Sequence, residues 1–112
     1  MTKPMVLVAA AALVDVDGRV LLCQRPEACL IRELDEELGI KVSHACLAPF
    51  VFASHEYESF HLLMPLYLVR RWEGTVRALE HKGLAWVRPR DMDRYPMPPA
   101  DPPLVAWLRD LL

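Results

Sequence analysis

The chain has 112 residues, of which 54% are hydrophobic and 25% are charged, and its formal net charge at pH 7 is -2. This length predicts one domain with its own hydrophobic core and is too short for two. The weakly acidic charge balance, without a basic run, argues against a nucleic-acid polymer as partner. Three cysteines without CxxC spacing and four histidines without metal-ligand spacing argue against a disulfide framework and a zinc site, and favour a reducing cytoplasm.

The first apolar run, residues 5–14, has two interpretations. A lysine before it and small apolar residues within it are also typical of a short signal peptide, although the run is too short to span a membrane. The run leads into Asp17-Gly18, and a second β-prone run follows at 19–24. Because Asp-Gly between two such runs predicts a β-hairpin, we favour a buried strand and its return partner, with a signal peptide as the minor alternative.

The rest of the chain alternates between strand and helix patterns. We expect a helix at 28–38, a β-prone stretch at 42–53 that breaks near Ala48-Pro49, and a strand at 61–70 that is buried on both faces. Pro65 inside that strand weakens the pairing on one side or marks a bulge. Further elements are predicted as a turn at 72–74, a short strand at 84–87, a helical turn at 88–94, a proline loop at 96–100 and a helix at 102–112.

The last helix has a clear start signal, with Asp101 as its N-cap and Pro102 at the first helical position. Strands with one helix in the middle and one at the end of the chain predict a single α/β domain over residues 1–112, a sandwich of helices around a mixed β-sheet.

The most informative stretch is residues 32–40, R-E-L-D-E-E-L-G-I. Glu33, Glu36 and Glu37 are spaced i, i+3, i+4, which places them on one face of a helix. Three crowded carboxylates need a compensating cation, and Mg²⁺ takes oxygen ligands and pairs with phosphate substrates, although Mn²⁺ accepts the same site. The alternative is an ordinary solvated acidic face, which is the commoner meaning of Glu-rich helices.

This stretch resembles R-E-U-x-E-E-x-G-U, where U is a bulky aliphatic residue, the helical half of the Nudix box. The likeness extends over most of the chain and is closest to MutT-type nucleoside triphosphate pyrophosphohydrolases, whose usual substrate is 8-oxo-dGTP. The resemblance implies an α/β/α sandwich with a mixed sheet, a box helix at 28–38 and a C-terminal helix at 102–112.

The first half of the box is not where the family has it. Counting back from Arg32 reaches Gly18 and Gln24, but residues 19–23 look like a strand and a glutamine stands where a glutamate belongs, so we consider this match accidental. By the family's spacing, a loop of roughly twenty residues is missing between Glu27 and Ala28. Either the protein lacks this loop or its residues are missing from the sequence. We favour the second explanation, because the flanks on both sides look intact.

The resemblance assigns roles to the acidic residues. It makes Glu36 and Glu37 metal ligands, and it makes Glu33 a ligand or the base that activates water. Glu80 is a ligand from a facing loop or the base itself, against the alternative of an exposed loop acid. Arg32 orients the catalytic carboxylate, against the alternative of a surface ion pair.

Four residues are candidates for substrate binding. Arg25 contacts a phosphate or the purine, or is simply solvated. Tyr57 and Phe60 stack on the base, or pack in the core as aromatics between strands usually do. Asp101 corresponds to a family position that hydrogen-bonds the purine edge, and an ionised aspartate would accept from guanine-type donors.

Three functions are consistent with these residues. The leading hypothesis is a Mg²⁺-dependent cytoplasmic enzyme that removes 8-oxo-dGTP from the nucleotide pool, acting as a monomer or weak dimer on a small-molecule nucleotide. The second keeps the mechanism but changes the substrate to another nucleoside diphosphate derivative. The third is a non-hydrolytic Nudix-fold binding module, which a true loop deletion would favour and the intact carboxylate trio disfavours.

The missing loop generates the first prediction. We expect the intact mass of the purified protein to exceed the 12.8 kDa of this sequence by about 2 kDa, as the box spacing implies. Mass spectrometry of the undigested protein checks this. A mass equal to 12.8 kDa would mean a truly truncated box, and would make the binding module the first hypothesis.

Overall fold

A computed structural model describes residues 3–26, 30–77 and 85–112 of the chain. Within them, four strands, two α-helices and two 3-10 helices follow one another in an α/β order. No helix in these parts of the chain is long and apolar enough to cross a membrane. In chain order the elements are β1 (Met5–Val14), β2 (Val20–Pro26), α1 (Leu30–Leu38), η2 (His44–Cys46), β3 (Ala48–Glu56), β4 (His61–Val69), η3 (Pro89–Arg94) and α2 (Pro102–Leu111).

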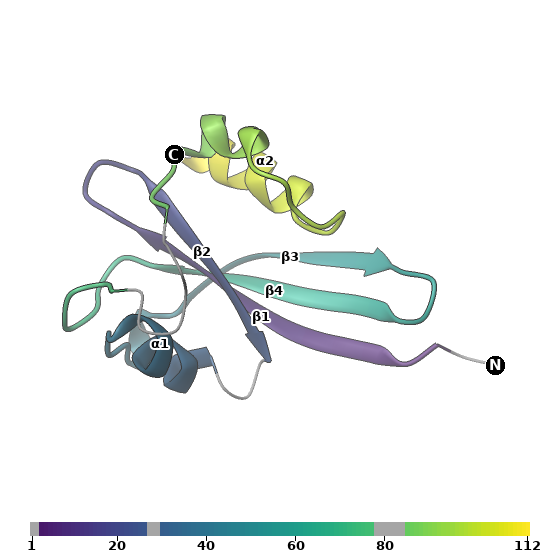
Figure 1. Cartoon of the computed structure of the whole chain (residues 1–112), viewed down its shortest axis with the longest axis horizontal. Helices are drawn as coiled ribbons and strands as arrows, with labels where there is room; N and C mark the ends of the chain where they lie inside the picture. Colours follow the sequence, from purple (N-terminus) through teal and green to yellow (C-terminus); the bar gives the residue numbers. More distant parts are fainter. Residues whose placement is uncertain (1–2, 27–29, 78–84) are drawn as a thin grey trace.

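The four strands form one mixed sheet in the order β2-β1-β4-β3. β1 pairs with β2 in antiparallel and with β4 in parallel orientation, and β3 pairs with β4 in antiparallel orientation. Helix α1 lies on one side of this sheet, and α2 with η3 lies on the other (Figure 1). The predicted α/β sandwich with a mixed sheet is therefore confirmed.

Strand β1 is buried on both faces over residues 9–14. Its even-numbered residues, such as Ala10 and Ala12, belong to the core cluster that includes Leu104 and Leu108 of α2. Its odd-numbered residues join the opposite cluster, which includes the leucines of α1. Because successive side chains of a strand point to opposite faces, a strand between two helical layers becomes a continuous apolar run. This is why the first strand has no polar alternation.

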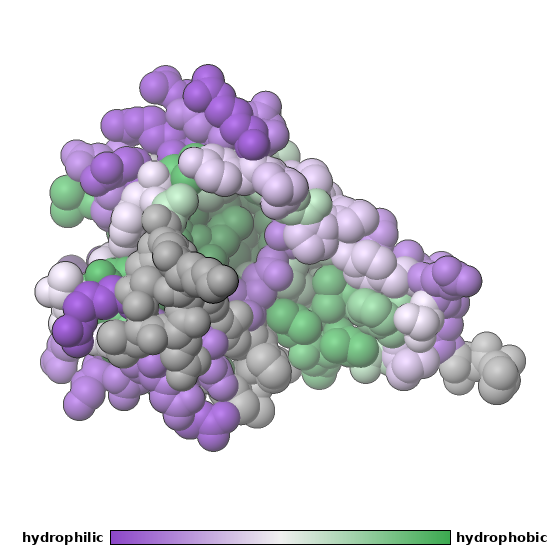
Figure 2. All heavy atoms as spheres, viewed as in Figure 1, coloured by the Kyte–Doolittle hydropathy of each residue, from purple (hydrophilic) through white to green (hydrophobic). Residues whose placement is uncertain are grey.

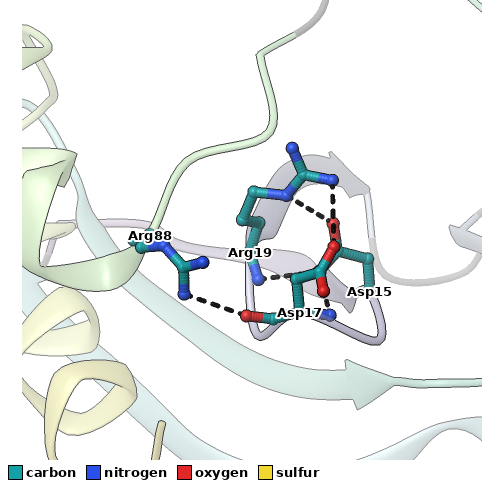
Figure 3. A network of polar contacts seen from close by, with 4 residues as sticks. All are labelled: Asp15, Asp17, Arg19 and Arg88. Atoms are coloured by element: carbon teal, nitrogen blue, oxygen red, sulfur yellow. Dashed lines mark hydrogen bonds and ion pairs between the residues drawn. The ribbon is translucent and has the colours of Figure 1, made fainter.

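The predicted hairpin between β1 and β2 is present (Figure 3). Gly18 has a φ of +79°, a left-handed conformation that glycine adopts without strain. Asp15 Oδ1 accepts hydrogen bonds from the backbone N–H groups of Asp17 (2.9 Å) and Arg19 (2.8 Å), and Arg19 Nε donates to Asp15 Oδ2 at 2.8 Å. Burial alone would raise the pKa of Asp15, but these hydrogen bonds and the charge of Arg19 hold that pKa below its ordinary value.

The hairpin turn is also tied to η3, because Arg88 Nη1 donates to the backbone carbonyl of Asp17 at 3.0 Å (Figure 3). Next to this contact the structure corrects the predicted strand at 84–87. Leu84 lies outside the described residues, and of the rest only Val87 is paired, in an isolated bridge with Val20. A single bridge satisfies the backbone of Val87, so the segment does not extend the sheet as a strand.

Both prolines in the second half of the sheet affect the pairing. The β3–β4 register is irregular between Pro49 and Val51, close to the predicted break, and the 3-10 helix η2 precedes β3. In the β1–β4 ladder the pairing stops after Leu63 and resumes at Leu66, whereas on the other side Pro65 pairs with Phe52. Pro65 thus weakens the pairing on one side only, as predicted, because proline has no N–H to donate.

Two glycines lie together at the C-terminal end of α1. Helix α1 is described from Leu30, and the earlier residues of the predicted 28–38 helix lie outside the described parts. Gly39 has a φ of +71° just after the helix, the conformation expected of a C-terminal glycine. Gly74, in the predicted turn, has a φ of +97°, and a Cβ there would lie only 2.8 Å from the Gly39 carbonyl oxygen. The two segments therefore approach each other at backbone distance.

The packing of α2 on one face of the sheet can be tested. Leu108 is 0% exposed and sits in the core, whereas Leu111 of the same helix is 45% exposed. We expect Leu108→Ala to lower the free energy of unfolding by about 2–5 kcal/mol, because it leaves a cavity beneath the helix. The matched control Leu111→Ala should lower it by about 1 kcal/mol or less. Urea denaturation measures both, and equal losses would contradict this placement of α2.

Candidate active site

Helix α1 is anchored by buried leucines and carries three glutamates outside that buried stripe. Leu30, Leu34 and Leu38 are buried against the sheet in the core cluster on that side. With 3.6 residues per turn, Glu36 lies opposite the leucine stripe, whereas Glu33 and Glu37 lie along its edge and are half-buried. The leucines therefore anchor the helix to the sheet, and of the three acids Glu36 is exposed to solvent.

Arg32 lies beside two of these carboxylates. Its Nε is 3.7 Å from Glu36 Oε1, one helical turn further on, and its Nη2 is 3.8 Å from Glu33 Oε1. The arginine and Glu36 side chains are both more than half exposed, so solvent screens these ion pairs and they add little stability. Their effect is local: one guanidinium offsets the repulsion between two carboxylates and limits their directions. The exposed ion pair given as the alternative for Arg32 is therefore present, and its role in orienting a catalytic carboxylate stays a prediction.

The acidic face has the donor chemistry of a Mg²⁺ site, since carboxylate oxygens are the ligands that hard divalent cations take. Among the described residues, however, no three aspartate, glutamate, histidine or cysteine side chains lie close enough together to share a metal ion. Glu80, the fourth predicted ligand, lies outside the described residues. The ligand set of Glu33, Glu36, Glu37 and Glu80, and the identity of the base, therefore stay predictions.

Asp101 is the one charged residue that is buried within the described parts of the chain, with 6% of its surface exposed. Gln24 Nε2 donates to both of its carboxylate oxygens at 2.9 Å. Burial raises the pKa of Asp101 above its ordinary value, and the hydrogen bond from Gln24 partly offsets that rise. The contact joins strand β2 to the start of α2 across 77 residues of sequence.

The predicted capping role of Asp101 is correct for its position and wrong for its side chain. Asp101 precedes α2, and its carbonyl accepts from the N–H groups of Leu104 (2.9 Å) and Val105 (3.1 Å). Its carboxylate makes no capping hydrogen bond. The reason is the sequence Pro102-Pro103: neither proline has an N–H, and the next N–H, that of Leu104, is already bonded to the Asp101 carbonyl. The carboxylate is therefore available to Gln24.

Sequence reasoning missed the importance of Gln24. It was correctly placed on a strand and rejected as a box residue, but its partner is far away in sequence. The pairing register puts Gln24 opposite Ala10, whose side chain lies in the core cluster beneath α2. Alternation in β2 could have indicated which face Gln24 occupies, but no local signal names Asp101 as its partner.

The predicted base-stacking residues lie in the β3–β4 hairpin. The rings of Tyr57 and Phe60 stack with centroids 4.9 Å apart, and His55 meets Tyr57 edge-on at 4.6 Å. Tyr57 and Phe60 pack against the core cluster on the α2 side of the sheet, the side that also contains Leu104 and Leu108. The structure thus shows core packing for both rings and leaves stacking on a base as a prediction.

Figure 2 shows a hollow with an apolar floor between α2 and the sheet. The acids of α1 are on the other side of the sheet (Figure 1). Arg25, the fourth predicted substrate-binding residue, pairs with Ala9 through its backbone, and its side chain lies outside what the structure describes. The sheet therefore lies between the acidic helix α1 and helix α2, which Asp101 precedes.

Comparison with known proteins agrees with this geometry. A family model described as NUDIX domain matches residues 9–107. The chain belongs to the Nudix family. Among curated relatives, the CTP pyrophosphohydrolase of Escherichia coli is 34% identical over 119 residues, which cover 85% of this chain and 85% of that protein. The 8-oxo-dGTP diphosphatase of Escherichia coli is 32% identical over 94 residues, covering 84% of this chain and 71% of that protein.

Solved structures give the same assignment. The solution structure of the E. coli ORF135 protein matches this Nudix chain with a TM-score of 0.73 and 30% identity, covering 97% of this chain and 91% of that one. A MutT structure from a study of Aliivibrio salmonicida and Vibrio cholerae matches with a TM-score of 0.75 and covers 94% and 96%, and its 22% identity shows the fold. The family predicted from the box helix is therefore confirmed.

The comparison also bears on the missing loop. The stretch aligned with CTP pyrophosphohydrolase is 119 residues long, which exceeds the 112 residues of the whole chain although only 85% of the chain takes part. That relative therefore has residues inside the aligned stretch without a counterpart here. In this sequence residues 27–29 stand between β2, which ends at Pro26, and α1, which begins at Leu30.

The buried carboxylate generates a prediction on pH. The folded-state pKa of Asp101 is raised above its ordinary 3.8, so between those two values the folded protein binds more protons than the unfolded chain. Asp101 therefore destabilises the fold progressively as pH rises through this window, and Asp101→Asn removes that titration. We expect the variant to gain stability relative to the wild type as pH rises above 3.8, and then to keep a constant difference.

Urea denaturation at a series of pH values from about 3 to about 7 measures this difference. Asp110→Asn is the matched control, because Asp110 is exposed near the far end of the same helix. A pH-independent difference for Asp101→Asn would contradict the raised pKa.

Proposed function

We propose that this Nudix protein hydrolyses a nucleoside triphosphate to a nucleoside monophosphate and pyrophosphate with the help of Mg²⁺. The observation that carries the proposal is α1, whose buried leucines fix a helix that presents Glu33 and Glu36 next to Arg32 and carries Glu37 beside Glu36. Phosphoryl-group chemistry needs neutralised phosphate charge and an oriented water molecule. A rigid helix that displays carboxylates supports both requirements.

In this mechanism Glu36 and Glu37 hold the cation, and Glu33 either holds it or accepts the proton of the attacking water. Glu80 is the other candidate for these two tasks. When bound, Mg²⁺ neutralises phosphate charge and makes the water more acidic. Arg32 acts on the carboxylates: at 3.7 Å from Glu36 and 3.8 Å from Glu33 it restricts their motion before substrate arrives. Preorganised charge of this kind lowers the barrier without reorganisation during the reaction.

For the base we propose 8-oxo-dGTP first, as in the relatives named 8-oxo-dGTP diphosphatase. Asp101 is buried just before α2 and accepts hydrogen bonds from Gln24 of β2. An ionised carboxylate accepts hydrogen bonds and donates none, and the Watson–Crick edge of guanine offers two adjacent donors. Arg25 would contact a phosphate or the purine, and Tyr57 and Phe60 would wall the base.

CTP is the second candidate substrate, since the relative named CTP pyrophosphohydrolase is covered over 85% of its length. The cytosine edge offers one amino donor beside an acceptor nitrogen. It therefore fits an ionised carboxylate less well than guanine does, because the acceptor nitrogen needs a donor that only a protonated carboxyl has. A non-hydrolytic binding module is the alternative that true absence of the box loop would favour. We place the protein in the cytoplasm as a monomer or weak dimer, with no nucleic-acid polymer and no membrane as partner.

The double substitution Glu36→Gln, Glu37→Gln tests the enzyme directly. We expect it to reduce kcat for pyrophosphate release at least about a hundredfold, because neutral amides are poor Mg²⁺ ligands. Steady-state assays with 8-oxo-dGTP and with CTP, each with Mg²⁺, measure this and rank the two substrates by kcat/KM.

Asp35→Asn is the matched control, since Asp35 is an exposed acid on the same helix that has no assigned role. It should retain activity within about threefold, as surface substitutions do. Turnover that survives the double change would make the metal-site assignment wrong. Wild-type protein that binds nucleotide without cleaving it would favour the binding module.

A further inference from the structure

We infer that Gln24 is a positioning residue for base recognition, which holds the Asp101 carboxylate as a hydrogen-bond acceptor and thereby sets the preference for a guanine-type over a cytosine-type edge. This inference rests on the proposed function and deepens it. It concerns a residue of β2 that lies outside the acidic helix and that neither the box motif nor the catalytic roles involve.

The geometry of the contact is the first support. A single amide nitrogen, Nε2 of Gln24, lies 2.9 Å from both oxygens of Asp101. A donor shared by two oxygens fixes the plane and the direction of a carboxylate more firmly than a bond to one oxygen does. Gln24 is itself held by the ladder between β1 and β2, opposite Ala10 in the centre of the sheet. The carboxylate is thus oriented from a strand that is hydrogen-bonded to the centre of the sheet.

The start of α2 is the second support. Asp101 has no capping bond to make, because Pro102 and Pro103 lack N–H groups, and its backbone carbonyl already serves Leu104 and Val105. A carboxylate that is only 6% exposed needs a donor, or it becomes protonated. Burial raises the pKa of Asp101 and the hydrogen bond from Gln24 lowers it, and within the described residues no charged group contributes to the shift. The hydrogen bond from Gln24 therefore favours the anionic form of Asp101.

The protonation state of this carboxylate decides which base edge it matches. In the anionic form each oxygen of Asp101 keeps a lone pair besides the one that accepts from Gln24, so the carboxylate can still accept from the N–H donors of guanine and donates to none. A protonated carboxyl offers one donor and one acceptor, which suit the acceptor nitrogen and amino group of cytosine. By favouring the anion, Gln24 favours guanine-type substrates, so its replacement should change specificity and not only affinity.

Two substitutions test this in opposite ways. Gln24→Leu keeps the approximate size of the side chain and removes the donor, whereas Gln24→Glu places a second carboxylate against Asp101, and the two must share a proton. For Gln24→Leu we expect KM for 8-oxo-dGTP to rise about tenfold with kcat changed less than about threefold. For Gln24→Glu we expect the kcat/KM ratio of CTP to 8-oxo-dGTP to rise about tenfold.

A titration without nucleotide separates positioning from catalysis. The side-chain carbon chemical shift of Asp101, followed by NMR against pH, reports its pKa in each variant. We expect that pKa to rise in Gln24→Leu and Gln24→Glu relative to wild type, and to stay unchanged in the control Asp110→Asn. A cycle with Asp101→Asn completes the test: Gln24→Leu should change KM less than about twofold when Asp101 is already replaced.

The outcomes are distinct. The inference is overturned if the pKa of Asp101 is the same in wild type and in the Gln24 variants. It is also overturned if Gln24→Leu changes KM equally in the Asp101→Asn background. A substrate ratio that stays constant in Gln24→Glu overturns the specificity role. If no variant and no wild-type protein releases pyrophosphate while the Asp101 pKa depends on Gln24, the proposed function fails and the contact stands. Gln24→Glu remains measurable if Gln24→Leu does not fold, because it keeps the shape and polarity of the native side chain.

Discussion

The central constraint in this molecule is the burial of β1 on both faces. Residues 9–14 of this strand are small or aliphatic, and helices cover them from either side. The alanines at positions 9–12 leave room for α1 and α2 to approach the sheet closely. Because β1 also pairs with β2 and β4, its position fixes both neighbouring strands and the two helices. The positions of the acids of α1 and of the start of α2 therefore depend on the position of β1.

Carboxylates are exposed on one side of the sheet and buried on the other. On the α1 side, the carboxylates are partly or largely exposed and an exposed arginine, Arg32, lies 3.7 Å from Glu36, so water and salt moderate their repulsion. On the α2 side, Asp101 is buried and depends on one neutral donor, Gln24. The first arrangement suits a cation that comes with its substrate. The second suits discrimination, because a buried acceptor left without a matching donor is unfavourable.

The stretch between β2 and α1 is where this sequence departs from the spacing of the Nudix box. The relative named CTP pyrophosphohydrolase has residues within the aligned stretch that have no counterpart in this sequence, and the box spacing predicts that they belong after Glu27. The packing of the sheet and helices does not depend on them: the TM-score with the E. coli ORF135 protein is 0.73 over 97% of the chain. The fold and the chemistry are thus separable here, since the core defines the scaffold and the loop would add to the site.

The sequence by itself determined the family, the order of nearly all elements and the acidic face of the box helix, because those features follow from local periodicity and from one motif read within 9 residues. The hairpin at Gly18 and the weakened pairing at Pro65 were likewise predictable, since each depends on the backbone chemistry of one residue. The short strand at 84–87 was not, because whether a short apolar segment pairs depends on which edge is available. The partner of Asp101 was decided only by the tertiary structure. Gln24 lies 77 residues away, and only the placement of β2 beneath the start of α2 brings its amide to the Asp101 carboxylate. That carboxylate makes no capping hydrogen bond, because the two prolines that follow have no N–H groups.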